Sequence, residues 1–153
     1  GMVRNFARTP KGNDRDQVKA IANGVGDVAI VNSYYMGKLL NSEDEAERTA
    51  AAAVKLFFPN QDDRGTHINI SGAGVTASST NLENAIALLE FLSGRQAQQA
   101  FARANFEYPV NPKAEDSPLK IMWGDFKTDN INLSLLGKHN FEAVTIFAKS
   151  GWR

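Results

Sequence analysis

Two adjacent tyrosines, Tyr34 and Tyr35, are the side chains of this sequence with the most distinctive chemistry. They are two of the chain's three tyrosines and follow directly on a short apolar run. A phenol has an ordinary pKa of about 10, so it ionises at neutral pH only beside a strong positive charge such as a metal ion. The phenolate oxygen is a hard ligand, and the chain has no cysteine and only two histidines, which argues against zinc or copper. Ferric iron is the metal that suits this donor best.

The same pair has an ordinary structural interpretation. Neighbouring side chains point to opposite faces of a strand, and on a helix they diverge by about 100°, so both hydroxyls do not normally meet one atom. A tyrosine pair at the start of a helix is more often a half-buried packing element with its hydroxyls in water. The first turn of a helix is the exception, because long side chains there can reach past the helix end towards a bound ligand. Spacing alone leaves packing and metal binding open.

The pair lies where a predicted strand becomes a predicted helix. Residues 27–31, "DVAIV", form a short apolar run rich in β-branched residues, which predicts a strand buried on both faces of a parallel sheet. Asn32 has the chemistry of an N-cap, so a helix is expected from Ser33 to Leu40. This assignment puts both tyrosines in the first turn of that helix.

Other elements are predicted from periodicity and capping signals. The spacing of apolar residues predicts helices at 81–93, 94–105 and 138–149, and an earlier helix that Asn13 or Asp14 can cap and Gly24 can end. Ser42 with Glu45 three residues later resembles a capping box for another helix. Short strands are expected at 3–7, 54–58 and 66–76. Together these elements predict one compact, helix-rich α/β domain over residues 1–153 with a short mixed sheet.

Composition excludes several functional classes. The 153 residues, 42% hydrophobic, are enough for one domain with its own core. Basic and acidic residues balance at 17 each, so nucleic acid is not an expected partner. No run approaches the roughly 20 apolar residues of a membrane span, so no membrane insertion is expected. The two histidines are far apart and no motif surrounds a serine, so the chain is not expected to be an enzyme.

Three longer segments carry a family resemblance. They are "NFARTPKGNDRDQVKAIANGVGDVAIVNSYYMGKLL", "FFPNQDDRGTHINISGAGV" and "NFEYPVNP". Over essentially the whole chain the sequence resembles the C-terminal half of the periplasmic ferric-iron-binding proteins, the substrate-binding components of iron(III) ABC importers. The resemblance implies the C-terminal part of a type II periplasmic-binding-protein fold, with residues 66–76 as a hinge-like strand. It also implies a periplasmic location and an ABC permease as the partner of the full-length protein.

The resemblance assigns roles to individual residues. In this family a tyrosine pair in an Asn-x-Tyr-Tyr context supplies two phenolate ligands to Fe(III), and Tyr34 and Tyr35 match that pair. Asn32 matches the asparagine before it, which lies near the bound anion in some members. Ser33 and Arg8 are further candidates for holding a synergistic anion such as carbonate, although a solvated loop arginine is the default for Arg8.

The chain departs from the family in length. Members are roughly twice as long, and the half that is missing should hold a further tyrosine. The site is therefore incomplete, and the isolated chain is expected to bind iron weakly if at all. The apolar residues Leu82, Ile86 and Leu89 would be exposed in a monomer, which predicts a homodimer. Two alternatives stay open: a lobe for a small anion or other non-metal solute, and a ligand-free structural or oligomerising fragment.

Overall fold

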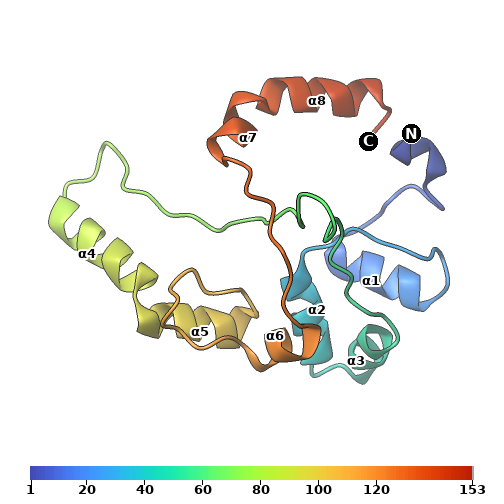
Figure 1. Cartoon of the computed structure of the whole chain (residues 1–153), viewed down its shortest axis with the longest axis horizontal. Coiled ribbons are helices and arrows are strands. Elements are labelled where there is room, and N and C mark those ends of the chain that lie inside the picture. Colours follow the sequence, from blue (N-terminus) through green and yellow to red (C-terminus); the bar gives the residue numbers. More distant parts are fainter. Residues whose placement is uncertain (153) are drawn as a thin grey trace.

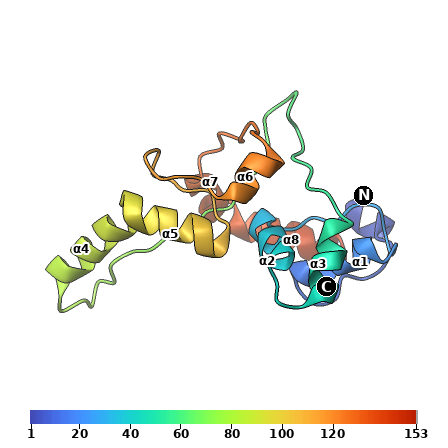
Figure 2. The same cartoon turned by 90° about the horizontal axis from the view of Figure 1, so that it is seen from below.

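Helices are the regular elements of the computed structural model, which describes residues 1–152. Helices α1, α2 and α3 pack together, α4 and α5 extend away as an arm, and α7 and α8 lie on a third side (Figures 1 and 2). The chain ends come together, since the Phe6 and Trp152 ring centroids are 5.3 Å apart. No helix in residues 1–152 is both long enough and apolar enough to cross a membrane. The bounds are η1 Met2–Asn5, α1 Asp14–Ala22, α2 Ser33–Leu40, α3 Glu45–Ala52, α4 Leu82–Ser93, α5 Arg95–Asn105, α6 Pro118–Trp123, α7 Ser134–Lys138 and α8 Asn140–Lys149.

The predicted short mixed sheet is not formed within the described part of the chain. Its one pairing between extended segments is an isolated parallel bridge from Thr66 to Thr128. Residues 27–31, 54–58 and the rest of 66–76 are not paired as strands, and residues 2–5 form a 3₁₀ helix instead of the strand expected at 3–7. The physical reason is that a strand needs a neighbour for its N–H and C=O groups. The apolar run at 27–31 has no such cover, and Val28 and Ile30 are 84% and 76% exposed.

Helix α1 begins and ends with local signals that the sequence carries. Asn13 Oδ1 accepts a hydrogen bond from the N–H of Arg15 at 2.9 Å, and the N–H of Asn13 donates to Asp16 Oδ2 at 2.8 Å, which makes a capping box. At the other end Gly24 has a φ of 72°. Its N–H and that of Val25 donate to the carbonyls of Ile21 and Ala20, the arrangement of a Schellman cap. The prediction of this helix is confirmed.

Helix α3 begins later than its sequence signal indicates. Its N-cap is Asp44, whose Oδ1 accepts a hydrogen bond from the N–H of Ala46 at 2.8 Å. Ser42, the predicted cap, instead donates from Oγ to Glu47 Oε2 at 2.7 Å and accepts from the N–H of Asp44. Two residues with capping chemistry compete within this short stretch, and the carboxylate closer to the helix takes the role.

The buried core lies between the first three helices. Val18 of α1, Met36 and Leu39 of α2, and Ala51 of α3 are all at most 3% exposed. Each large apolar side chain buried in this way contributes about 1.5–3 kcal/mol to folding. Partly buried residues surround this cluster: Val31, Leu40, Val54, Leu56 and Trp123. The cluster fixes the position of α2, the helix that carries the tyrosine pair.

A glycine in α2 allows a close approach to the end of α5. A Cβ built on Gly37 would lie 2.6 Å from both Cβ and Cγ of Phe106. Phe106 itself follows α5 in a left-handed conformation, with a φ of 59°. The backbone of α2 therefore touches the Phe106 side chain where any other residue would keep the two apart.

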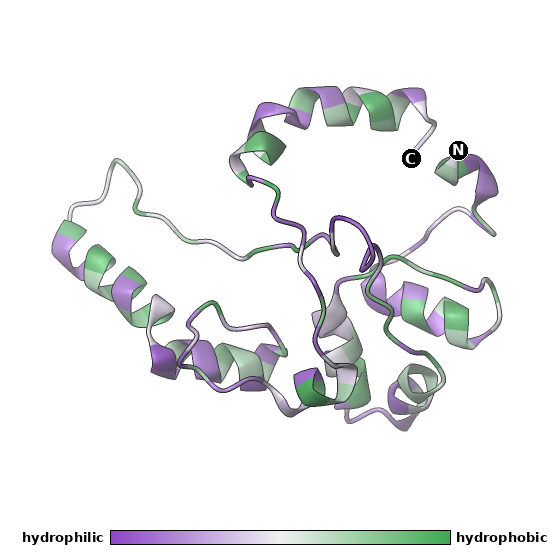
Figure 3. Cartoon of the chain, viewed as in Figure 1, coloured by the Kyte–Doolittle hydropathy of each residue, from purple (hydrophilic) through white to green (hydrophobic). Residues whose placement is uncertain are grey.

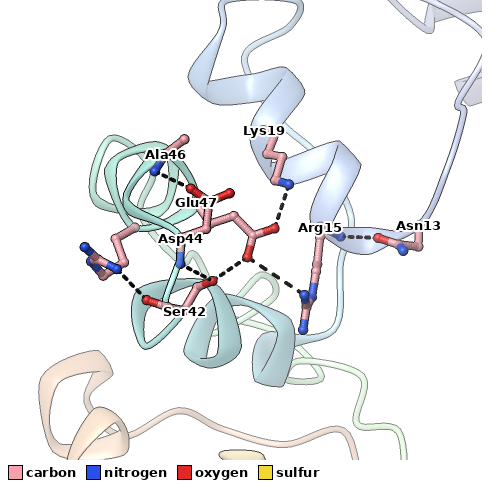
Figure 4. Close-up of polar contacts among 8 residues, drawn as sticks. Asn13, Arg15, Lys19, Ser42, Asp44, Ala46 and Glu47 are labelled. Atoms are coloured by element: carbon pink, nitrogen blue, oxygen red, sulfur yellow. Dashed lines mark hydrogen bonds and ion pairs between the residues drawn. The ribbon is translucent and has the colours of Figure 1, made fainter.

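A polar cluster joins α1 to α3 at the surface. Glu47 of α3 points towards α1, where its carboxylate lies 2.7 Å from Lys19 Nζ and 3.9 Å from an Arg15 guanidinium nitrogen (Figure 4). The hydrogen bonds from Lys19 and Ser42 lower the pKa of the Glu47 carboxyl. The same contact with Glu47 raises the pKa of the Lys19 ammonium.

The helices outside the core leave apolar side chains uncovered. The predicted helices at 81–93, 94–105 and 138–149 are confirmed as α4, α5 and α8, and α7 is a further short helix before α8 that the sequence analysis did not predict. Leu82 and Ile86 on α4 are exposed as expected, whereas Leu89 is half-buried. Hydrophobic residues recur along the length of both α4 and α8 (Figure 3).

Replacing Gly37 by alanine should destabilise the fold. The new methyl group would push α2 and Phe106 apart, and overpacking of this kind costs about 1–3 kcal/mol. Urea unfolding followed by circular dichroism measures the change. Gly137→Ala in α7 is the matched control, because nothing lies within 4 Å of a Cβ there. It should be neutral or stabilising by up to about 1 kcal/mol, and equal effects of the two changes would contradict the assigned contact.

The contribution of Glu47 to stability should depend on pH. The pKa of Glu47 is lowered below its ordinary value of 4.5 in the folded state, so its stabilising effect is present above that value. It is lost as the pH falls through the lower, folded-state pKa. Wild type should therefore be more stable than Glu47→Gln at pH 7, and the difference should shrink towards pH 3. Glu45→Gln, on the same helix, is the control variant, because it removes a carboxylate and leaves the contacts of Glu47 with Lys19 and Ser42 in place.

Candidate metal-binding pair at the start of helix α2

Tyr34 and Tyr35 lie in the first turn of α2, as the sequence predicts. Their ring centroids are 4.2 Å apart with an angle of 31° between the ring planes, and both side chains are half-buried. The two rings therefore lie side by side, despite the divergence expected of neighbours on a helix. An arrangement of this kind lets both hydroxyls serve one ligand near the helix start.

The surroundings of Tyr34 keep its phenol protonated when no cation is bound. Hydrogen bonding to Tyr35 and then burial raise the pKa of Tyr34 to about 12, with smaller effects from the negative charges of Asp14 and Glu107. The ammonium group of Lys38 lies over the Tyr34 ring, with its Nζ 5.1 Å from the ring centroid. The Tyr34 phenol therefore needs a strong positive charge nearby in order to ionise at neutral pH.

Asn32 precedes α2 but does not cap it with its side chain. Its backbone N–H and its Nδ2 both donate to Asp14 Oδ2, at 2.8 Å and 3.0 Å. A third contact, at 3.5 Å, joins Asn32 Oδ1 to Asn69 Nδ2 in the segment 66–76. Sequence reasoning gave Asp14 a role only at the start of α1, as a candidate cap or as an acidic residue beside the positive end of that helix. No spacing signal connects it to Asn32, because the contact spans 18 positions and depends on how α1 meets α2.

The other predicted site residues are placed differently. Ser33 is the first residue of α2 and is half-buried. The Arg8 guanidinium donates to the carbonyl of Thr9 at 3.1 Å and to Gln17 Oε1 at 3.4 Å. It lines a hollow with Thr9, Lys11, Gly12 and Asp16, and no tyrosine belongs to that lining. The structure therefore does not join Arg8 to the pair.

The third tyrosine has a packing environment. The Tyr108 hydroxyl is buried with no hydrogen-bond partner among the described residues, and its ring meets Phe126 edge-on at 5.3 Å. Burial, followed by the charges of Asp116 and Asp125, raises the pKa of Tyr108 to about 12. In residues 1–152 no three His, Asp or Glu side chains gather as a metal site. Tyr34 and Tyr35 are thus the hard donors that this part of the chain brings together as a pair.

The architecture closely matches part of solved ferric-binding proteins. A Trichodesmium protein, IdiA or FutA, solved in complex with iron and citrate ligands, matches with a TM-score of 0.94 and 44% identity. The match covers 99% of this chain and 48% of that one. The ferric binding protein of Campylobacter jejuni matches with a TM-score of 0.94, 38% identity and the same coverage. The helix-rich chain therefore has the architecture of one part of the type II periplasmic-binding-protein fold.

Protein sequences give the same relationship. Iron uptake protein A2 of Synechocystis is 46% identical over all of this chain, which covers 45% of that protein. The major ferric iron-binding protein of Neisseria meningitidis serogroup A is 32% identical over 62% of this chain and 28% of its own length. The chain thus spans about half the length, or less, of these relatives. The family model for the bacterial extracellular solute-binding protein matches residues 4–126, and the chain belongs to that family.

Proposed function

We propose that this chain supplies two phenolate ligands, Tyr34 and Tyr35, to a ferric-iron site in an iron-uptake binding protein. The observation that carries the proposal is the side-by-side placement of the two rings in the first turn of α2. Support comes from relatives named for ferric iron or iron uptake, one of them solved with iron and citrate. Phenolate oxygen is also the hard donor that suits a small, highly charged cation.

Binding and release would be the whole mechanism, without chemical turnover. The ferric ion is the cargo, and its charge offsets the cost of removing protons from the two phenols. Protonation of the phenolates or reduction to ferrous iron would weaken binding and let the ion go. In the full-length protein, opening of the two lobes at an ABC permease in the periplasm would have the same effect.

Two phenolates fill only part of the coordination sphere of the ion. The chain spans 45% of iron uptake protein A2, so the remaining ligands would come from a further lobe, with residues 66–76 as the hinge segment between lobes. A synergistic anion such as carbonate or citrate would occupy positions that neither lobe fills. The exposed Leu82 and Ile86 of α4 give apolar surface for a partner, and the homodimer stays a prediction.

Ferric nitrilotriacetate is a suitable probe for a site that supplies only two of the ligands of the ion. The chelator fills most of the octahedral positions of the ion and leaves room for two phenolates. Titration of the chain should produce a visible phenolate-to-iron charge-transfer band. The band should disappear in the Tyr34→Phe, Tyr35→Phe double variant and persist in Tyr108→Phe, the matched control, because Tyr108 lies in a separate aromatic cluster.

A chain that stays colourless, or a double variant that keeps the band, would contradict the proposed function. Measuring the Tm with citrate alone and with ferric citrate distinguishes ferric binding from binding of a non-metal solute. If citrate alone raises the Tm as much as ferric citrate does, the chain is a lobe for an organic anion. If neither changes the Tm, the chain is a ligand-free fragment.

Ferric binding should strengthen as the pH rises. The pKa of Tyr34 is raised to about 12, so its phenol is protonated over the whole neutral range and must lose that proton on binding. Each proton released adds about one tenfold step in affinity per pH unit. Titrations with ferric nitrilotriacetate at several pH values should give a steeper dependence for wild type than for Tyr34→Phe. Hydrolysis of the iron chelate affects wild type and Tyr34→Phe equally at each pH, so it cancels when the two affinities are compared. Equal slopes of affinity against pH in the two proteins would exclude Tyr34 as a ligand.

A further inference from the structure

We propose that Asp14 is the positioning residue of the tyrosine pair, because it holds Asn32 at the start of α2. The placement concerns the protein without metal, and its effect on iron binding rests on the ferric site proposed above.

The Asp14 side chain is free for this role because other residues cap its own helix. Asn13 and Asp16 form the capping box of α1, and Asp14 takes no part in it. Asp14 Oδ2 instead accepts two hydrogen bonds from the same residue, Asn32, through its backbone N–H and its Nδ2. Bonds to a charged acceptor are the stronger kind, roughly twice as strong as those between neutral groups.

Two bonds to one residue fix both the backbone and the side chain of Asn32. The residue keeps the extended conformation of an N-cap, with a φ of −77° and a ψ of 134°. Its carbonyl can then accept the N–H of Tyr35 at 3.1 Å, which closes the first turn of α2. Asp14 thus acts on Tyr34 and Tyr35 through Asn32, from a different helix.

The test compares Asp14→Asn with Asp16→Asn, two isosteric changes in the same turn of α1. The Asp14→Asn variant keeps an acceptor for the N–H of Asn32 but loses the charge, while Asp16→Asn affects only the capping box. In ferric nitrilotriacetate titrations Asp14→Asn should weaken binding by about 10–100-fold, the usual effect of losing a residue that orients a metal ligand. Asp16→Asn should change the affinity by less than about threefold, because its partner Asn13 does not contact Asn32.

A second readout needs no metal. The Tyr34 and Tyr35 rings, with centroids 4.2 Å apart, give a near-ultraviolet circular dichroism signal that depends on how they are placed. In a Tyr108→Phe background, Asp14→Asn should change this tyrosine signal while the far-ultraviolet spectrum stays as in wild type, and Asp16→Asn should leave both spectra unchanged.

Asn32→Ala provides the remaining comparison. It removes one of the two bonds to Asp14, so it should weaken ferric binding and change the near-ultraviolet tyrosine signal as Asp14→Asn does. In the double variant the two losses should be less than additive, because both residues act through one contact. Wild-type affinity and an unchanged near-ultraviolet signal in Asp14→Asn would overturn the proposal. A changed signal in a protein that binds no iron would instead refute the ferric function and leave the positioning role of Asp14 standing.

Discussion

Burial of the apolar face of α2 is the constraint on which the candidate site depends. Leu39 is fully buried and Met36 nearly so, between α1 and α3. A helix is stiff along its axis, so fixing these two residues also fixes the first turn, where Tyr34 and Tyr35 lie. The core is small, and the site therefore depends on a few contacts that each contribute about 1.5–3 kcal/mol.

Tyr34 lies against Tyr35, and its surroundings disfavour ionisation of its phenol. Hydrogen bonding to Tyr35 and burial raise its pKa, so the phenol is uncharged at neutral pH. In the proposed ferric site, only a highly charged ion would offset this cost. Loss of that charge would then restore the protons to the phenols and favour release.

Apolar segments of this chain have the composition of buried structure, but their side chains are exposed to solvent. The run at 27–31 has the pattern of a central strand, yet Val28 and Ile30 face solvent. The chain matches about half of the solved proteins that it resembles. A pattern selected for burial in a larger assembly cannot form a sheet without its neighbours, because backbone pairing is supplied by other segments.

The sequence by itself determined the features that depend on near neighbours along the chain. Helices α1, α2, α4 and α5 and the place of the tyrosine pair all follow from local chemistry. Only the tertiary structure decided the contacts between distant residues. It paired Asp14 with Asn32, brought Phe106 against Gly37 and left the expected strands unpaired. Such contacts depend on how helices meet in space, and a single sequence carries no local signal for that geometry.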